Sequence, residues 1–254
     1  MNTCADRNDL IGPGERADDL QRGGYYILQN PKRFCFGIDA VLLSGFAEAH
    51  ARERVLDLGT GTGVIPVLMR ARYKSRNYTG LEIDPEMADM ARRSVIYNGL
   101  QDCVQIVQGD LKQTRTLFPA AGFDVVTSNP PYMPAGHGKV NDDSEHTVSG
   151  ARHELWCTLE DVISAASYAL REQGRFYMVH RPFRLAEIIK TLSRYRLEVK
   201  RLRLVYPKED REPNMVLVEA RKGGAEGMKV LPPLIVYDRE GAYTKEIMEI
   251  YYGE

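Results

Sequence analysis

The tetrapeptide Asn129-Pro130-Pro131-Tyr132 could bind and orient a planar amino group. It follows the apolar run 123–128, typical of a buried parallel strand, and Pro131 ends that strand because it cannot donate a ladder hydrogen bond. The Asn129 side-chain oxygen and the Pro130 carbonyl could accept both N–H bonds of an adenine-type amine, and the Tyr132 ring offers a stacking face. Such a grip favours a pyramidal nitrogen whose lone pair faces an electrophile. Taken alone, the tetrapeptide is more often a strand-ending turn.

A glycine-rich turn upstream could hold the electrophile. Residues 54–63 read as an apolar strand that runs into the turn, and residues 64–72 as an amphipathic helix, so backbone N–H groups and a helix start could face a ligand. The dinucleotide pattern G-x-G-x-x-G fails in both registers, because Val64 and Pro66 stand where its third glycine belongs. The pattern Asp-x-Gly-x-Gly-x-Gly, which begins at Asp57, resembles the S-adenosylmethionine loop instead. Asp57 could orient that loop or reach the ligand's amino group. Packing alone is the other interpretation.

Two acidic residues follow later strands. Glu82 lies 21 residues beyond Gly61, where a doubly wound fold places the carboxylate that accepts hydrogen bonds from ribose hydroxyls. Asp110 follows a short apolar strand at 103–107 and could bond the adenine amino group of the cofactor. Singly, each acid is more typical of a helix cap or a solvated loop. Four ordered strand-end signals would converge on one edge of a parallel sheet, so together they predict a methyl-transfer site.

The elements that must position these residues alternate between apolar strands and amphipathic helices, which predicts an α/β, doubly wound, mostly parallel seven-stranded sheet with an antiparallel C-terminal strand. We expect residues 1–19 to form a flexible arm and residues 20–254 a single domain. A lid is expected at 134–151. The remaining expected elements are Asp84 as a helix N-cap before Pro85, helices near 158–171 and 183–195, a strand at 174–179, a hairpin of strands at 199–206 and 214–220, and a docked strand and helix at 234–252.

Composition agrees with one ordinary globular domain, since 43% of the 254 residues are hydrophobic and 27% are charged. No secretory signal or membrane-length apolar run is present, so we expect a cytoplasmic protein without membrane contact. The cysteines lack a C-x-x-C pair and indicate reduced thiols. His137, His146 and His153 lack a zinc spacing, so no metal is expected.

The chain is similar to class I S-adenosylmethionine-dependent methyltransferases, and more narrowly to the bacterial tRNA(Val) adenine N6-methyltransferases. The resemblance covers roughly residues 19–252, and beyond the two motifs it includes residues 19–21, 34–43, 151–154 and 209–214. It implies N6-methylation of the adenine 3′ of the anticodon, at tRNA position 37, with S-adenosyl-L-methionine as methyl donor. The segment from Phe36 to Asp39 matches the family's extra cofactor-contacting region, although Phe34 and Phe36 are equally typical of an alternating core strand.

These expectations define a candidate site. The catalytic group is Asn129, Pro130 and Tyr132. The cofactor-binding group is Phe36, Asp39, Asp57, Gly59, Gly61, Gly63, Glu82, Ile83, Asp110, Leu111 and Asn129. The net charge of −1 gives no general attraction to nucleic acid, but residues 171–203 contain ten bases and three acids. RNA contacts are therefore expected at Arg181, Arg194, Arg196 and Arg201, unless the charges point in unrelated directions. His180 and Arg181 are expected to border the substrate cleft.

Three rival functions remain open. A protein-glutamine N5-methyltransferase that acts on a release factor also needs to hold a planar amide NH2. Such enzymes usually carry a substantial helical domain before the cofactor loop, whereas 54 residues precede Val55. A guanine N2-methyltransferase that acts on ribosomal RNA is the second rival. The third is a non-catalytic RNA-binding module, against which the presence of Asp57, Glu82, Asp110 and the proline motif argues.

Overall fold

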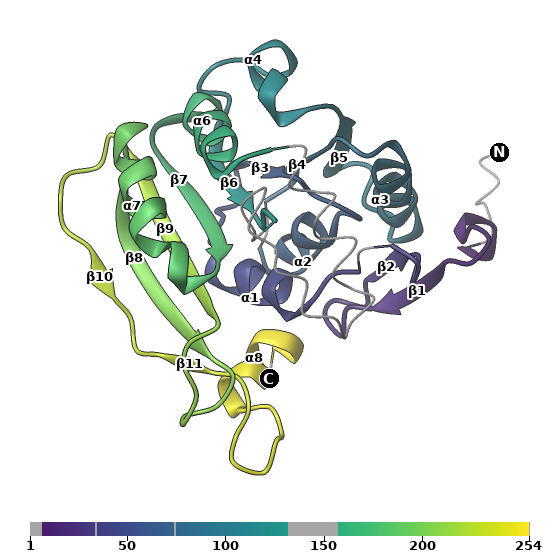
Figure 1. Cartoon of the computed structure of the whole chain (residues 1–254). Helices are drawn as coiled ribbons and strands as arrows, with labels where there is room; N and C mark the ends of the chain where they lie inside the picture. Colours follow the sequence, from purple (N-terminus) through teal and green to yellow (C-terminus); the bar gives the residue numbers. More distant parts are fainter. Residues whose placement is uncertain (1–6, 34, 74, 132–156, 254) are drawn as a thin grey trace.

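A mixed β-sheet forms the centre of the molecule (Figure 1). The structure is a computed structural model that describes residues 7–33, 35–73, 75–131 and 157–253. Within these residues the sheet has nine strands. Their order is β10 (Lys229–Val230), β8 (Leu197–Tyr206), β9 (Met215–Lys222), β7 (Leu170–His180), β6 (Phe123–Ser128), β3 (Arg54–Leu58), β4 (Asn77–Glu82) and β5 (Val104–Gln108), and β11 (Leu234–Ile235) also pairs with β8.

Among the described strands of this sheet most pairs are parallel, and β9 alone runs antiparallel to its neighbours β7 and β8. The predicted α/β fold, with a mostly parallel sheet and an antiparallel C-terminal strand, is therefore confirmed. The seven predicted strands are supplemented by β10 and β11, which have two residues each.

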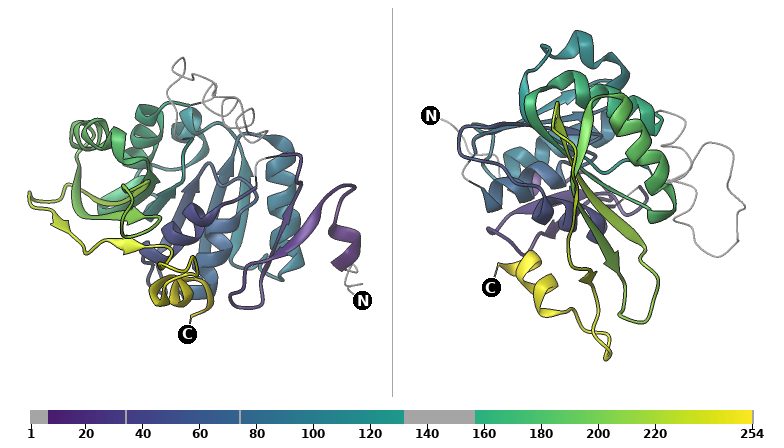
Figure 2. Two further views of the ribbon diagram at one scale, coloured as in Figure 1. Left: turned by 60° about the horizontal axis from the view of Figure 1, so that its bottom comes forward. Right: turned by 90° about the vertical axis from the view of Figure 1, so that its left-hand side faces the viewer.

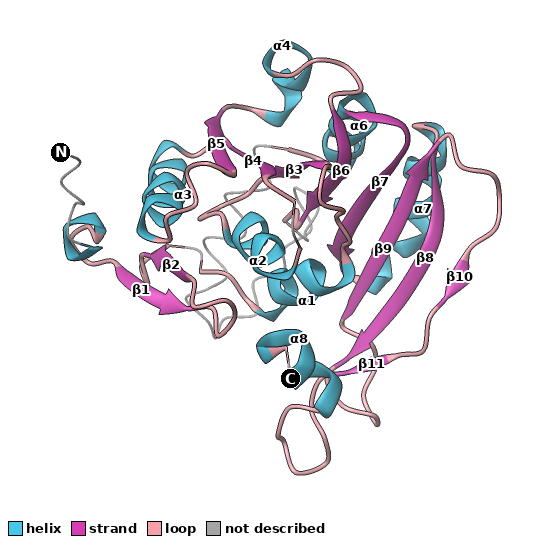
Figure 3. Cartoon of the chain, turned by 180° about the vertical axis from the view of Figure 1, so that it is seen from behind, coloured by secondary structure: helices cyan, strands magenta, loops and turns pink. Residues whose placement is uncertain are grey.

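Helices cover both faces of the sheet (Figures 1 and 2), as the near-continuous burial of β3 and β6 requires. One hydrophobic core lies under α1 (Ile38–Phe46), α2 (Val64–Arg72), α3 (Pro85–Tyr97) and α8 (Lys245–Tyr252). The second core lies under α6 (Leu159–Ala169) and α7 (Leu185–Arg194), and the short α4 (Thr114–Leu117) packs against α6. In Figure 3 the strands form one twisted layer between these helices.

The order of the strands reverses between β3 and β6. From β3 the chain proceeds through β4 and β5 toward one end of the sheet, whereas β6 leads through β7 toward the other. The last residues of the two central strands, Leu58 and Ser128, are paired with each other. Ligands of doubly wound folds bind at such a switch point, beyond the carboxyl ends of the strands. The loops that begin at Gly59 and Asn129 therefore start side by side at the favourable edge.

Local sequence signals explain the helix starts at this edge. The Asp84 side chain accepts hydrogen bonds from the N–H groups of Glu86 and Met87, with Pro85 as the first helical residue, so the predicted N-cap of α3 is confirmed. A capping box between Thr158 and Asp161 begins α6.

Several boundaries differ from expectation. The described part of the arm contains regular structure: a 3-10 turn (Arg7–Leu10) precedes β1 (Arg16–Asp19), which pairs with β2 (Tyr26–Gln29) in an antiparallel hairpin beside α3. Arg93 of α3 forms an ion pair with Glu15 of this segment at 2.5 Å, so residues 7–19 have defined contacts where a flexible arm was expected. Strand β7 begins at Leu170, four residues early, because Leu170 pairs with Phe123 before a register shift. The hairpin of β8 and β9 and the C-terminal strand and helix are confirmed.

Candidate active site

The glycine-rich loop joins β3 to α2 at the switch point. Gly61 and Gly63 have φ of 57° and 87°, in the left-handed region that glycine adopts without strain. A Cβ added at Gly59 would meet no atom of the described residues within 4 Å, so these residues leave the outer side of the loop open to close approach by a ligand. This openness fits the predicted cofactor loop.

The N–H groups of the loop are used differently from expectation. Those of Gly59 and Thr60 both donate to the Leu81 carbonyl, at 2.9 and 3.0 Å, and that of Gly61 donates to Oε2 of Glu82 at 2.8 Å. In the structure these three donors fasten the loop to β4, and contact of the loop with a cofactor stays a prediction. The register of β3 against β4 brings Leu81 and Glu82 within reach of these N–H groups, and a single motif does not reveal that register.

Glu82 ends β4 and is only 6% exposed. Its Oε2 accepts the Gly61 N–H, and its Oε1 accepts the Asp84 N–H at 2.9 Å. Each carboxylate oxygen can accept two hydrogen bonds, so this geometry leaves the ribose role chemically possible. The two backbone bonds hold the carboxylate rigidly between the loop and α3. The next residue, Ile83, is half-buried beside it.

Asp57 is fully buried one residue before the end of β3. The Thr127 hydroxyl on β6 donates to Oδ1 of Asp57 at 2.6 Å, while Oδ2 has no hydrogen-bond partner within the described residues. Burial raises the pKa of Asp57 to about 7; the hydrogen bond from Thr127 opposes this rise, as does more weakly the nearby Thr60 hydroxyl, which lies outside hydrogen-bond geometry, and the Glu82 carboxylate adds to it. A buried oxygen without a partner at a ligand-binding edge suits a group that receives a cationic ligand.

Asp110 follows β5 at the same edge. Its side chain accepts the Lys112 N–H at 2.9 Å and caps the 3-10 turn Leu111–Gln113. The structure thus gives Asp110 the capping role that its residue type suggested, and its position leaves an adenine contact as a prediction. Leu111 packs against the core under α6.

The segment from Phe36 to Asp39 leads into α1 and is held by the N-terminal hairpin. The Phe36 N–H donates to Oε1 of Gln29 at 2.9 Å, and Nε2 of Gln29 donates to Asp18. Phe36 lies outside any strand and packs partly buried against the core under α1, so the alternating-strand interpretation is wrong for this residue. Phe34 lies outside the described residues.

Two side chains that sequence reasoning missed bring this segment to the site. Gln29 is 2% exposed although it ends an otherwise apolar strand, and that contrast was the available signal. Arg33 donates to Oδ2 of Asp84 at 3.0 Å and also pairs with Glu86. The segment before α1 is thereby tied to the start of α3, beside Glu82.

Asn129 and Pro130 follow β6 directly, half-buried and buried respectively. The preceding Ser128 hydroxyl donates to the Leu58 carbonyl at 2.9 Å, which fixes the end of β6 against the strand that enters the glycine loop. The expected amine grip and the expected cofactor loop therefore begin at adjacent strand ends. Tyr132, the proposed lid and the three loop histidines lie outside the described residues.

His180 ends β7, next to β6, and is fully buried. Burial and the Arg184 guanidinium lower the pKa of His180 to about 4, so its imidazole is neutral near pH 7. The Arg181 N–H donates to Nδ1 of His180 at 2.7 Å, which assigns the ring proton to Nε2. Because β7 runs parallel to β6, with Met178 paired to Ser128, both residues lie at the same edge of the sheet as Asn129; that they border a substrate cleft stays a prediction.

The four expected RNA-contacting arginines do not share one surface. Arg201 lies on the α1 side of the sheet, where it pairs with Glu219 and, at 2.9 Å, with Glu48. Arg194 lies on the opposite side, at the end of α7, and pairs with Glu160 of α6. The sequence excess of positive charge between residues 171 and 203 is offset by acids from elsewhere in the chain, so the expectation of one patch is wrong for Arg201.

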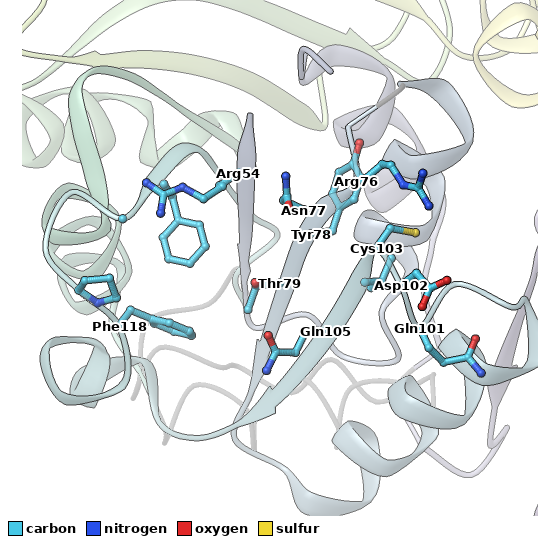
Figure 4. Close-up of a pocket in the computed structure, with 14 residues that line it drawn as sticks. Arg54, Arg76, Asn77, Tyr78, Thr79, Gln101, Asp102, Cys103, Gln105 and Phe118 are labelled. Atoms are coloured by element: carbon cyan, nitrogen blue, oxygen red, sulfur yellow. The ribbon is translucent and has the colours of Figure 1, made fainter. Parts of the chain in front are cut away.

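The structure also contains a hollow of about 410 Å³ at the opposite edge of the sheet (Figure 4). Its lining includes Arg54, Asn77, Val104 and Phe123, which begin β3, β4, β5 and β6. It therefore lies at the amino ends of the strands, away from Asn129 and Glu82. No cluster of three metal-ligating side chains occurs among the described residues, and no helix there is long and apolar enough to cross a membrane.

Comparisons with known proteins agree with this arrangement. Residues 36–200 match the model of the methyltransferase small domain family. A tRNA1(Val) (adenine(37)-N6)-methyltransferase of Porphyromonas gingivalis strain W83 is 31% identical over 84% of this chain and 86% of its own length. The protein of the same name from Bacteroides thetaiotaomicron is 32% identical over 72% of this chain and 74% of its own.

Solved structures show the same fold. The crystal structure of a protein from Agrobacterium tumefaciens, described as a predicted O-methyltransferase, superposes with a TM-score of 0.68 at 26% identity and covers 85% of this chain and 96% of its own. With the family match over more than half of the chain and the open, glycine-lined strand end, these likenesses identify the chain as a class I S-adenosylmethionine-dependent methyltransferase that belongs to the methyltransferase small domain family.

Proposed function

We propose that this methyltransferase transfers the methyl group of S-adenosyl-L-methionine to N6 of an adenine in tRNA, the adenine at position 37 of tRNA(Val). The observation that carries the proposal is the pairing of Leu58 with Ser128, which starts the cofactor loop and the Asn129-Pro130 amine grip side by side. A donor in the loop and an amine at the grip would then lie within reach of each other.

On the cofactor side, the residues present fit the ligand. The Oδ2 atom of Asp57 would accept a hydrogen bond from the amino group of the methionine part. Glu82 would accept hydrogen bonds from the ribose hydroxyls, and Asp110 and Leu111 would contact the adenine. Phe36 and Asp39 approach from the start of α1, and Ile83 flanks the ribose acid. When bound, the cofactor supplies an electrophilic methyl carbon on a sulfonium.

On the substrate side, Asn129 and Pro130 accept hydrogen bonds from the two N–H groups of the flipped adenine, and Tyr132 is assigned the role of stacking on its ring. Asn129 and Pro130 would aim the N6 lone pair at the methyl carbon that the bound cofactor would supply, and the electron pair of the carbon–sulfur bond would stay on sulfur. The methylated nitrogen then loses its extra proton to water. Neutral His180 beside this edge adds no positive charge that would repel the developing ammonium.

Substrate choice is supported by the names of the two bacterial relatives described above, which are both tRNA1(Val) (adenine(37)-N6)-methyltransferases at moderate identity. Phe183 adds a structural feature, because it is 69% exposed in the turn after β7. An exposed aromatic ring suits stacking on an unpaired RNA base next to the target.

The test is mass spectrometry of nucleosides from tRNA of cells that lack the gene. The proposal predicts loss of N6-methyladenosine from tRNA(Val) and its return when the gene is restored, but not when an Asn129→Ala version is supplied. Unchanged tRNA together with loss of methylglutamine from a release factor would replace the proposal with the protein-glutamine reaction. Loss of methylguanine from ribosomal RNA would replace it with guanine N2-methylation.

A further inference from the structure

Thr127 is a buried polar residue with a defined partner that the catalytic proposal does not use. It is fully buried in β6, and its hydroxyl donates to Oδ1 of Asp57 at 2.6 Å. The two residues are direct register partners on neighbouring strands, so the contact requires no side-chain rearrangement. Valine has nearly the same shape and would fill the same space without the hydrogen bond.

Two consecutive side chains of β6 hold the end of β3 from opposite faces of the sheet. Thr127 and its partner Asp57 lie on the α1 and α2 side, because Val55 and Val125, two residues earlier on each strand, belong to that core. Ser128 reaches the Leu58 carbonyl on the other side. Only the Thr127 contact involves an ionisable group.

We propose that Thr127 is a positioning residue, whose hydroxyl orients the Asp57 carboxylate so that its second oxygen receives the amino group of the cofactor. With Oδ1 occupied by Thr127, Oδ2 is the acceptor left without a partner among the described residues. Because β6 continues into Asn129 two residues later, the same strand then sets both the cofactor carboxylate and the amine grip. This inference rests on the cofactor-binding part of the proposed function.

The hydroxyl also acts on the charge of Asp57. Burial raises the pKa of this carboxyl to about 7, and the Glu82 carboxylate from β4 adds to the rise, whereas the hydrogen bond from Thr127 on β6 lowers it. The nearby Thr60 hydroxyl of the loop acts in the same direction but more weakly, because it lies outside hydrogen-bond geometry. A hydrogen bond donated to a carboxylate favours its ionised form, so removal of Thr127 raises the pKa further. A cationic amino group binds the ionised form, and cofactor affinity therefore weakens up to tenfold per pH unit below the pKa.

The experiment measures the dissociation constant of S-adenosylmethionine by calorimetry between pH 5.5 and 8.5 for the full-length wild type, Thr127→Val, Thr127→Ser and Ser128→Ala. At pH 7.5 we expect Thr127→Val to weaken binding about tenfold, the scale of one lost hydrogen bond to a charged group. Its affinity should begin to fall at a pH about one unit higher than in the wild type. The cofactor's own amino group titrates equally in every sample and cancels in this comparison.

The serine variant retains the hydroxyl and should restore the wild-type pH profile. Ser128→Ala removes the neighbouring buried hydroxyl and should keep the wild-type profile with affinity within about twofold, which separates positioning of Asp57 from general support of β6. If Thr127→Val does not fold, Thr127→Ser and Thr127→Cys give the same comparison, since a thiol is a much weaker donor. A folded Thr127→Val or Thr127→Cys protein with wild-type affinity and pH profile would overturn the inference.

Failure of the inference differs from failure of the proposed function. If the wild type binds no S-adenosylmethionine at any pH, the cofactor assignment itself is wrong. If the wild type binds and all four proteins behave alike, only the role of Thr127 is wrong.

Discussion

Glu82 provides the sharpest test of the cofactor site, because its carboxylate has defined partners. Alanine at this position removes the acceptor of the Gly61 and Asp84 N–H groups and, in our account, of the ribose hydroxyls. A hydrogen bond to a charged group contributes about 1.5–3 kcal/mol, so we expect Glu82→Ala to weaken S-adenosylmethionine binding roughly 10- to 150-fold. Glu82→Gln keeps one acceptor oxygen and should lie at the lower end.

A matched control is available on the next helix. Glu86→Ala makes the same change of charge, but the Glu86 side chain is 67% exposed and pairs with Arg33 at the surface, so we expect less than a twofold effect. Isothermal calorimetry gives the dissociation constants, and thermal unfolding shows that each variant is folded. An unchanged dissociation constant in folded Glu82→Ala would remove Glu82 from the ribose role. An equal effect of Glu86→Ala would show that net charge, not the hydrogen bonds, controls affinity.

The remaining predictions concern chemistry, stability and RNA. Asn129→Ala should lower the single-turnover rate about 100-fold or more with cofactor affinity intact, and a rate near wild type would contradict the amine grip. Arg201→Ala should lower the free energy of unfolding in urea by roughly 2–3 kcal/mol, because the Glu219 carboxylate, which is 4% exposed, then lacks its charged partner. The Michaelis constant for tRNA should stay unchanged in this variant. Joint replacement of Arg194 and Arg196 should lower the free energy of unfolding by less than about 1 kcal/mol. It should raise the Michaelis constant for tRNA and make the salt dependence of that constant shallower. An unaltered salt dependence would exclude both residues from the RNA-binding surface.

Much of the fold could be predicted because its signals are local. The apolar runs that became β3 and β6 end at glycine and proline, and these residues mark strand ends whatever the rest of the chain does. Asp84 followed by Pro85 marks a helix start in the same way. The convergence of the site followed from topology, since parallel strands place their carboxyl ends at one edge.

What could not be predicted depends on partners far away in the sequence. The position of residues 7–19 against α3 involves the ion pair of Glu15 with Arg93, which lies 78 residues away in the sequence. The loop N–H groups were assigned to a ligand because the motif alone does not show that Leu81 and Glu82 accept them. Thr127 gave no signal, because threonine is an ordinary strand residue until Asp57 is placed opposite it.

The basic stretch failed for the same reason. The acids that neutralise Arg194 and Arg201 come from α6, from β9 and from the segment after α1. A count within residues 171–203 misses all three of these acids. Burial adds a second limit, because the pKa of Asp57 near 7 depends on complete enclosure of its side chain rather than on its neighbours in sequence.

The proposed enzyme methylates an adenine of tRNA whose amino group is held by Asn129 and Pro130. The most direct measurement incubates the purified enzyme and tritiated S-adenosylmethionine with unmodified tRNA(Val), with tRNA(Val) whose adenine 37 is changed to guanine, and with a release factor. Our account predicts label in the first RNA alone, with a rate that falls steeply as salt increases. Label in the release factor alone, or equal label in both RNAs, would contradict it.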